Sequence, residues 1–104
     1  MIEITPVLFR VKRGRQYVDD GVTAVFPCDP SDYAGDEMSC YAHVGQHGSC
    51  TVGWYHTTRA AKPEEYASLQ KELEAKPYEY KLRVYKRMQS WMRDTRHETA
   101  RNYK

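Results

Sequence analysis

Residues 63–85 read PEEYASLQKELEAKPYEYKLRVY, and the hydrophobic period changes within this stretch. Before Pro77 the apolar side chains recur at helical spacing, at Tyr66, Leu69 and Leu73. Pro63 suits the first helical position, and Pro77 ends the pattern. After Pro77 the period becomes two, with one face formed by Tyr80, Leu82 and Val84. The stretch therefore predicts a helix followed by a strand whose outer face is cationic.

Four segments before this helix have the composition of strands: 7–12, 22–26, 38–44 and 51–57. In the first segment, alternation separates Val7, Phe9 and Val11 from Leu8, Arg10 and Lys12. We expect a tight turn at Asp20–Gly21, and we expect Pro27 to end the second strand because it has no N–H for a ladder. The acidic residues within 28–37 predict an exposed loop.

From Met88 onward the apolar period is helical again, with a stripe formed by Tyr85, Met88, Trp91, Met92, Thr95 and Thr99. The order of elements predicts an α+β fold with a small, mostly antiparallel sheet of about five strands. One face of the sheet is expected to be covered by the helix that follows the fourth strand. We expect residues 1–87 to form a single domain and residues 88–104 to form a basic, amphipathic C-terminal helix or tail.

The composition is that of a globular protein, because 40% of the 104 residues are hydrophobic and 29% are charged. No apolar run approaches the roughly 20 residues that span a bilayer, so we expect no transmembrane segment. The first residues lack a basic leader followed by an apolar stretch, so we expect no signal peptide. The odd cysteine count argues against a disulfide framework and predicts a cytoplasmic protein with thiols at Cys28, Cys40 and Cys50.

The positive charge is concentrated at the end of the chain. Residues 81–104 hold eight Lys or Arg residues against two Asp or Glu residues, a net charge of +6, whereas the whole chain carries +2. Basic side chains interspersed with aromatic ones are typical of nucleic-acid binding. The predicted contacts are Arg83, Lys86, Arg87, Arg93, Arg96 and Arg101. An acidic protein is the alternative partner, and the apolar stripe alternatively predicts packing or homo-oligomerisation through Met88, Trp91 and Met92.

Residues 40–50, CYAHVGQHGSC, contain two cysteines and two histidines, which are the donor types that zinc prefers. Strand alternation would send the side chains of Cys40 and His43 to opposite faces, so we expect no zinc at Cys40, His43, His47 and Cys50, and no other cofactor. Residues 45–49, GQHGS, are expected to form the connection of a hairpin.

Three roles remain open for the polar side chains of this hairpin. His43 and His47 are candidate general acid and base residues for phosphodiester cleavage, since histidine titrates near neutrality. A small ligand would instead contact Tyr41, His43, Gln46 and His47. In the third interpretation, the histidines and Gln46 support the tight hairpin by local hydrogen bonds.

Three segments together resemble a group of small proteins from gut bacteria and their phages or mobile elements: residues 26–27, 39–49 and 58–74. In that group an HVGQH segment precedes a helix that begins PEEY. The resemblance covers about residues 20–87 and implies one compact domain in a mobile-element context, without implying an activity. Cys40 and Cys50 depart from the pattern, and the segment after residue 87 is an addition to it.

No complete catalytic set is evident, so we predict a small, non-enzymatic binding protein that engages nucleic acid or an acidic partner through its basic C-terminal segment. One alternative is a histidine-based small-ligand or phosphodiester-processing site at the hairpin. A second alternative is a purely structural or oligomerisation module.

Overall fold

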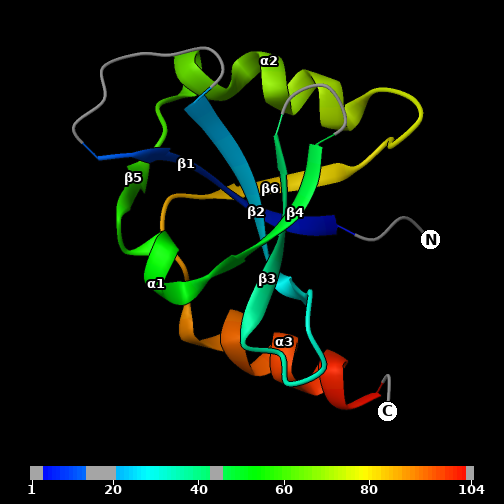
Figure 1. The fold of residues 1–104 in the computed structure, drawn as a ribbon. Helices are drawn as coiled ribbons and strands as arrows, with labels where there is room; N and C mark the ends of the chain where they lie inside the picture. Colours follow the sequence, from blue (N-terminus) through cyan, green and yellow to red (C-terminus); the bar gives the residue numbers. More distant parts are fainter. Residues whose placement is uncertain (1–3, 14–20, 43–45, 103–104) are drawn as a thin grey trace.

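The computed structural model describes residues 4–13, 21–42 and 46–102, except the side chain of Gln46. Asp20 of the predicted turn and His43 of the predicted site lie outside the described residues. The strands are β1 (Ile4–Lys12), β2 (Val22–Pro30), β3 (Glu37–Ala42), β4 (Gln46–Thr51), β5 (Thr58–Ala60) and β6 (Lys81–Tyr85). The helices are α1 (Val52–Tyr55), α2 (Pro63–Glu74) and α3 (Ser90–Asn102) (Figure 1).

The strands form one six-stranded sheet in the order β4-β3-β2-β1-β5, and β6 also pairs with β1. Every pairing is antiparallel except that of β6 with β1. β5 runs beside the end of β1, where Arg10 is opposite Ala60, while β6 runs beside its beginning, where Ile4 is opposite Lys81. The predicted α+β class with a mostly antiparallel sheet and a C-terminal helix is confirmed.

Both faces of the sheet carry buried side chains, so the burial extends beyond the single covered face that the sequence predicted. Alternation in β1 sends Val7, Phe9 and Val11 toward α2, where they pack with Leu69 and Leu73. The opposite face of the sheet buries a second cluster, which consists of Leu8, Val25, Met38, Cys50 and Tyr55. The α2 and α3 helices lie on opposite sides of the sheet (Figure 1).

The predicted end of the second strand at Pro27 was wrong, because β2 continues to Pro30. The pairing of β2 with β3 shifts register between Phe26 and Pro30, and a bulge of this kind tolerates a residue without an N–H. The loop between these strands is correspondingly shorter than predicted. Its bend includes Gly35, whose φ of 79° lies in the left-handed region.

The predicted strand over residues 51–57 was also wrong. β4 ends at Thr51, whose hydroxyl accepts a hydrogen bond from the Trp54 N–H at 3.0 Å. This N-cap begins the single helical turn α1, and β5 starts only at Thr58. The covering helix therefore follows the fifth strand, not the fourth.

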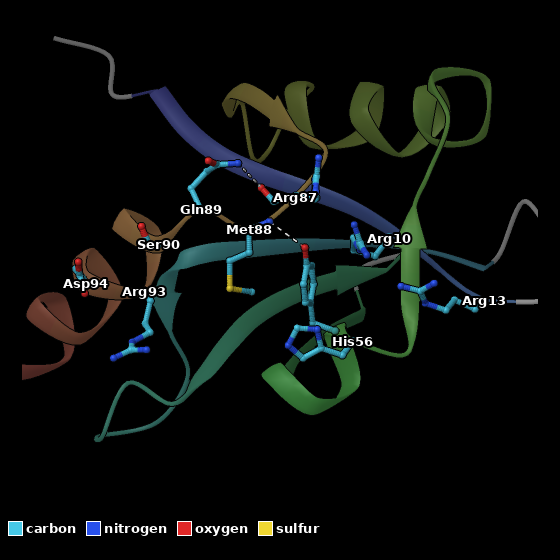
Figure 2. Close-up of a pocket in the computed structure, with 10 residues that line it drawn as sticks. Arg10, Arg13, His56, Arg87, Met88, Gln89, Ser90, Arg93 and Asp94 are labelled. Carbon is cyan, nitrogen blue, oxygen red and sulfur yellow. Dashed lines mark hydrogen bonds between the residues drawn. The ribbon is translucent and has the colours of Figure 1, made fainter.

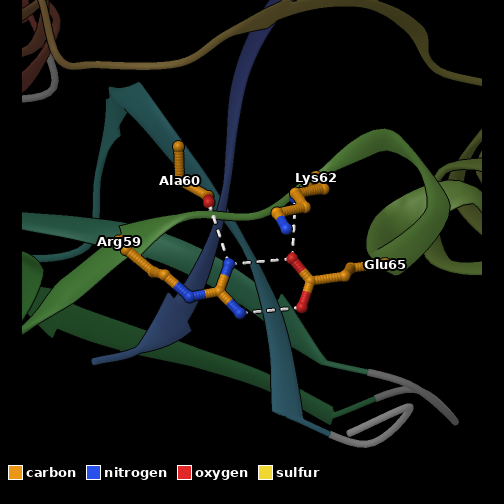
Figure 3. A network of polar contacts seen from close by, with 4 residues as sticks. All are labelled: Arg59, Ala60, Lys62 and Glu65. Carbon is orange, nitrogen blue, oxygen red and sulfur yellow. Dashed lines mark hydrogen bonds and ion pairs between the residues drawn. The ribbon is translucent and has the colours of Figure 1, made fainter. Parts of the chain in front are cut away.

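The predicted α2 helix is confirmed from Pro63 to Glu74, although Lys62 at the N-cap makes no side-chain hydrogen bond to the helix. Glu65 satisfies this helix end instead, since its carboxylate accepts from the Lys62 N–H at 2.8 Å (Figure 3). The same carboxylate binds both terminal nitrogens of Arg59 at 2.8 Å. Glu65 therefore connects α2 to β5, the strand that carries Arg59.

The α3 helix packs against β2 and buries Met92, Arg96 and Ala100. The buried Arg96 donates from Nε to the Gly35 carbonyl at 2.7 Å and from a terminal nitrogen to the Pro27 carbonyl at 2.8 Å. The C-terminal helix is thus part of the packed body. Among the described residues, no helix is both long enough and apolar enough to cross a membrane.

Candidate anion-binding site

A hollow of about 610 Å³ lies where β1, α1 and α3 meet, and we refer to it as the basic hollow (Figure 2). Its lining residues are Arg10, Arg13, Tyr55, His56, Arg87, Met88, Gln89, Ser90, Arg93 and Asp94. The set comprises four arginines and a histidine against one carboxylate. These residues come from β1 and the residue after it, from the end of α1, from the segment after β6 and from the first turns of α3.

Arg10 forms the floor of the basic hollow and is only 5% exposed. Its guanidinium donates to the Thr58 hydroxyl and carbonyl, both at 2.9 Å, and to the Lys86 carbonyl at 2.8 Å. The guanidinium also lies over the Tyr55 ring, 4.3 Å from its centroid. Burial lowers the pKa of Arg10, because no carboxylate among the described residues pairs with it to offset the desolvation.

The segment between β6 and α3 at the rim of the basic hollow is anchored to the rest of the chain and is also hydrogen-bonded within itself. The Met88 N–H donates to the Tyr55 hydroxyl at 2.9 Å, which ties this segment to α1 (Figure 2). The Gln89 side-chain amide donates to the Arg87 carbonyl at 3.1 Å. These contacts place the first turn of α3 beside the hollow, and the N–H groups of a helix N-terminus favour a negative charge there.

Four basic side chains of the hollow are exposed: Arg13, His56, Arg87 and Arg93. Arg13 is held beside β5 by a backbone hydrogen bond from its N–H to the Thr57 carbonyl at 3.1 Å. Guanidinium groups form forked hydrogen bonds that match the oxygens of phosphate or carboxylate. The arrangement therefore suits an anionic group, with exposed donors around a buried positive charge.

The predicted nucleic-acid contacts divide into four groups. Arg87 and Arg93 line the basic hollow, whereas Lys86 and Arg101 are exposed without lining it. Arg83 lies elsewhere, with its guanidinium 5.5 Å from the centroid of the Tyr85 ring. Placing Arg96 on this surface was wrong, because it is 1% exposed and donates to main-chain carbonyls.

The residues predicted for self-association are mostly occupied within the chain. Met92 is fully buried, and its sulfur accepts from the Gln89 N–H at 3.3 Å. Met88 packs against the cluster that contains Tyr55. Trp91 is 44% exposed and contacts Tyr85 edge-on, with ring centroids 5.9 Å apart. Met92 is therefore buried inside the chain and is not part of the surface predicted for self-association.

The predicted connection at residues 45–49 was wrong for Gln46 to Ser49, which belong to β4. His47 is opposite Tyr41 in the sheet, and their rings meet edge-on at 4.8 Å between centroids. The His47 ring also meets the Tyr78 ring at 5.7 Å, with the Tyr78 hydroxyl 3.4 Å from Nε2. Of the predicted ligand contacts, His43 and the Gln46 side chain lie outside the described part of the chain.

Tyr41 is 1% exposed, and its hydroxyl donates to the Glu72 carboxylate on α2. His47 lies at the exposed edge of this packed aromatic group, and it also lines a hollow of about 470 Å³ whose other described lining residues include no basic side chain. The described residues therefore support a packing role for Tyr41 and His47, while support of the hairpin by local hydrogen bonds from the histidines and Gln46 stays a prediction.

The side chains considered above for zinc are divided between the two faces of the sheet where the structure describes them. His47 faces the aromatic group that contains Tyr41, whereas Cys40 and Cys50 face the second buried cluster on the other side of the sheet. Within residues 4–13, 21–42 and 46–102, no three metal-ligating side chains form a group that could hold an ion.

Three lining residues of the basic hollow were not predicted as site residues: Arg10, Arg13 and His56. Alternation placed Arg10 only on the strand face opposite Val7, Phe9 and Val11, without a role in a site. One signal was present, since an arginine among apolar residues such as Leu8 and Phe9 is unusual unless its charge is satisfied inside the fold. Arg13 and His56 carried no such signal, because only the pairing of β5 with β1 brings their segments together.

Comparisons with protein-family models, with curated proteins and with solved structures found no match, so the resemblance of residues 20–87 stays a prediction.

Proposed function

We propose that this chain is a nucleic-acid-binding protein whose basic hollow holds a backbone phosphate. The observation that carries the proposal is that Arg13, Arg87 and Arg93 line one hollow from three separate segments, together with the buried Arg10. Among the described residues of that lining, Asp94 is the single carboxylate. Such a site favours an anion that can accept several forked hydrogen bonds at once.

The charge distribution favours nucleic acid over an isolated small anion. Residues 81–104 carry a net charge of +6, and the exposed Lys86 and Arg101 extend the cationic surface beyond the basic hollow. A polyanion gains from cations spread along a surface, because each phosphate contact releases a condensed counterion. An acidic protein presents carboxylates at less regular spacing, and it is the competing outcome of the test below.

The mobile-element context implied by the resemblance is compatible with a nucleic-acid partner, and a cytoplasmic location belongs to the same proposal. The free thiols at Cys28, Cys40 and Cys50 support that location, since thiols persist in a reducing compartment.

The test is fluorescence anisotropy with labelled single-stranded and duplex DNA and RNA oligonucleotides, at salt concentrations between about 50 and 200 mM. Replacing Arg87 or Arg93 with Glu is expected to weaken binding about tenfold or more, since each change replaces an attraction with a repulsion at the phosphate. The slope of log affinity against log salt should fall with each substitution. Truncating the chain at residue 87 is unsuitable, because it removes the buried Met92, Arg96 and Ala100.

The matched control is Arg101→Glu, which makes the same change of net charge on an exposed position of α3 outside the basic hollow. We expect it to weaken binding less than Arg93→Glu does. Equal losses in both variants would show that net charge alone decides binding and would remove the basic hollow from the proposal. Failure of every oligonucleotide to bind at the lowest salt, with an acidic polypeptide binding instead, would replace nucleic acid by a protein partner.

A further inference from the structure

Two of the three cysteines meet across the β3–β4 hairpin. Cys40 is opposite Gly48 and Met38 is opposite Cys50, so Cys50 lies diagonally from Cys40 on the same face of the sheet. Gly48 lies beside the Cys40 sulfur, since a Cβ at that position would make an ordinary contact with it at 3.6 Å. Both side chains line the same hollow, and a hydrogen bond between the two thiols is the largest cause of the pKa shift of each.

The two thiols differ in access to solvent. Cys50 is 7% exposed and belongs to the second buried cluster, while Cys40 is half-buried. Both line a hollow of about 470 Å³, together with Thr23, Ala42, Gly48 and Trp54 among others. A small oxidant can therefore reach Cys40 from this hollow, while Cys50 is beside it in the interior.

The hydrogen bond gives the two sulfurs different acidities. The Cys50 S–H donates to the Cys40 sulfur, which lowers the pKa of Cys40 to about 7 and raises that of Cys50. Cys28 has no such partner, and burial raises its pKa. The thiolate is the reactive form of cysteine, so Cys40 is the nucleophile of the three near neutral pH.

We propose that Cys40 is a site of oxidation by hydroperoxides and that Cys50 resolves the product as an intramolecular disulfide. The Cys40 thiolate attacks one oxygen of hydrogen peroxide, the O–O bond breaks, and the products are a sulfenic acid and hydroxide. Cys50 gives its proton to the hydroxide, and its sulfur then attacks the Cys40 sulfur. The S–O bond breaks, the S–S bond forms, and the second hydroxide leaves as water after taking a proton from solvent.

In the net reaction, two thiols and one molecule of hydrogen peroxide give one disulfide and two molecules of water. Peroxide is reduced, and the two sulfurs together lose two electrons. The sulfurs must approach to about 2.05 Å, and β4 can make this adjustment because it is an edge strand that pairs only with β3. The proposal is independent of the basic hollow, which lies elsewhere on the sheet.

The test treats the full chain with hydrogen peroxide after removal of reductant, alkylates the remaining thiols under denaturing conditions, and measures intact mass. We expect the oxidised chain to lose two hydrogens and to accept one alkyl group, whereas the reduced chain accepts three, one for each cysteine. Trypsin leaves all three cysteines within residues 16–59, so the bridge is mapped with chymotrypsin, which cleaves after Tyr33, Tyr41 and Trp54.

Cys28→Ser is the matched control and should oxidise at the wild-type rate. Cys50→Ser should stop at a sulfenic acid on Cys40 that dimedone traps, and Cys40→Ser should lose the rapid reaction, with a rate at least about tenfold lower. A bridge that includes Cys28, equal oxidation of all three cysteines, or dimers linked through Cys40 in the wild-type chain would overturn the proposal. The disulfide is mapped in the wild-type chain, which needs no substitution. The proposal can therefore be tested even if one of the variants fails to fold.

Discussion

The buried guanidinium of Arg96 donates from Nε to the carbonyl oxygen of Gly35, 2.7 Å away. This contact joins the middle of α3 to the loop between β2 and β3, and a second contact joins it to Pro27 at 2.8 Å. Burial lowers the pKa of Arg96, whereas the nearby carboxylates of Asp36 and Asp32 favour its charged form. Arg96 thus serves the docking of α3, although the sequence suggested that it contacts a partner.

Replacing Arg96 with Met should lower the free energy of unfolding by about 2–4 kcal/mol, because two buried carbonyls lose a charged donor. Part of the loss is offset, since the desolvated cation is also removed. Chemical denaturation measured by circular dichroism gives the value. The neighbouring Arg93→Met affects an exposed side chain and should change stability by less than about 0.5 kcal/mol. Similar losses in the two variants would contradict the role of Arg96 in docking.

Gly35 should not tolerate a side chain. Its φ is 79°, and an added Cβ would lie 3.0 Å from His97 Cδ2 and 3.1 Å from the Ala100 Cβ. We therefore expect Gly35→Ala to destabilise the chain by about 1–3 kcal/mol, through backbone strain and displacement of α3. Gly53→Ala is the control, because its nearest neighbour is 3.7 Å away and its φ is ordinary. Equal melting temperatures for the two variants would mean that α3 does not pack closely against Gly35.

Local patterns predicted the elements whose packing follows from their own alternation or periodicity. Val7, Phe9 and Val11 share a face as expected, and α2 begins at Pro63 as expected. The prediction of a strand over residues 51–57 failed because one side-chain hydrogen bond outweighs the strand-like composition of that segment. The Thr51 hydroxyl captures the Trp54 N–H and begins a helical turn in a segment whose residues favour a strand.

The candidate site was predictable only in part, because its geometry depends on contacts between distant segments. Arg87 and Arg93 were identified from charge alone, and both line the basic hollow. Arg10 could not be identified in this way, since its partners Thr58 and Lys86 lie 48 and 76 positions away along the chain. The burial of Arg96 has the same origin, because its carbonyl partners are 61 and 69 positions away.

The ion pair of Glu65 with Arg59 predicts a pH-dependent contribution to stability. Hydrogen bonds from Arg59 and from the Lys62 N–H lower the pKa of Glu65 from 4.5 to about 2. Since the folded-state pKa is depressed, the contribution is present above about pH 4.5 and is lost as the pH falls toward 2. Glu65→Gln should cost about 1 kcal/mol at pH 7, a modest value because Arg59 is 30% exposed to screening solvent.

Denaturation of wild type and Glu65→Gln at several pH values measures this contribution, with Glu64→Gln as a control on an exposed residue of the same helical turn. The difference between wild type and Glu65→Gln should shrink below pH 4.5, whereas Glu64→Gln should stay close to wild type throughout. A constant difference down to pH 2 would contradict the assigned ion pair.

A packing role for His47 predicts a small effect on stability and none on binding. His47→Ala removes ring contacts with Tyr41 and Tyr78 at an exposed position and should cost about 0.5–1 kcal/mol. Tyr41→Ala removes a buried ring and should cost about 3–5 kcal/mol. Oligonucleotide affinity should be unchanged in His47→Ala. A large loss of affinity in a folded His47→Ala variant would instead revive the histidine site as the functional one.

The hydrogen bond from Cys50 to Cys40 predicts how fast Cys40 is alkylated at each pH. The rate of alkylation by iodoacetamide is measured against pH in a Cys28→Ser background. The rate should rise with pH through a midpoint near 7, which is the pKa that Cys50 confers on Cys40. Below that pH the rate should be low, because the Cys40 thiolate is protonated. The charge of Arg96 lowers the pKa of Cys50, whereas the charge of Glu37 raises it. These two charges oppose each other and do not take the place of the hydrogen bond between the thiols. Adding Cys50→Ala removes the donor and should move the midpoint toward the ordinary cysteine value of 9.0. Midpoints near 9.0 with and without Cys50 would show that the thiols do not share a proton.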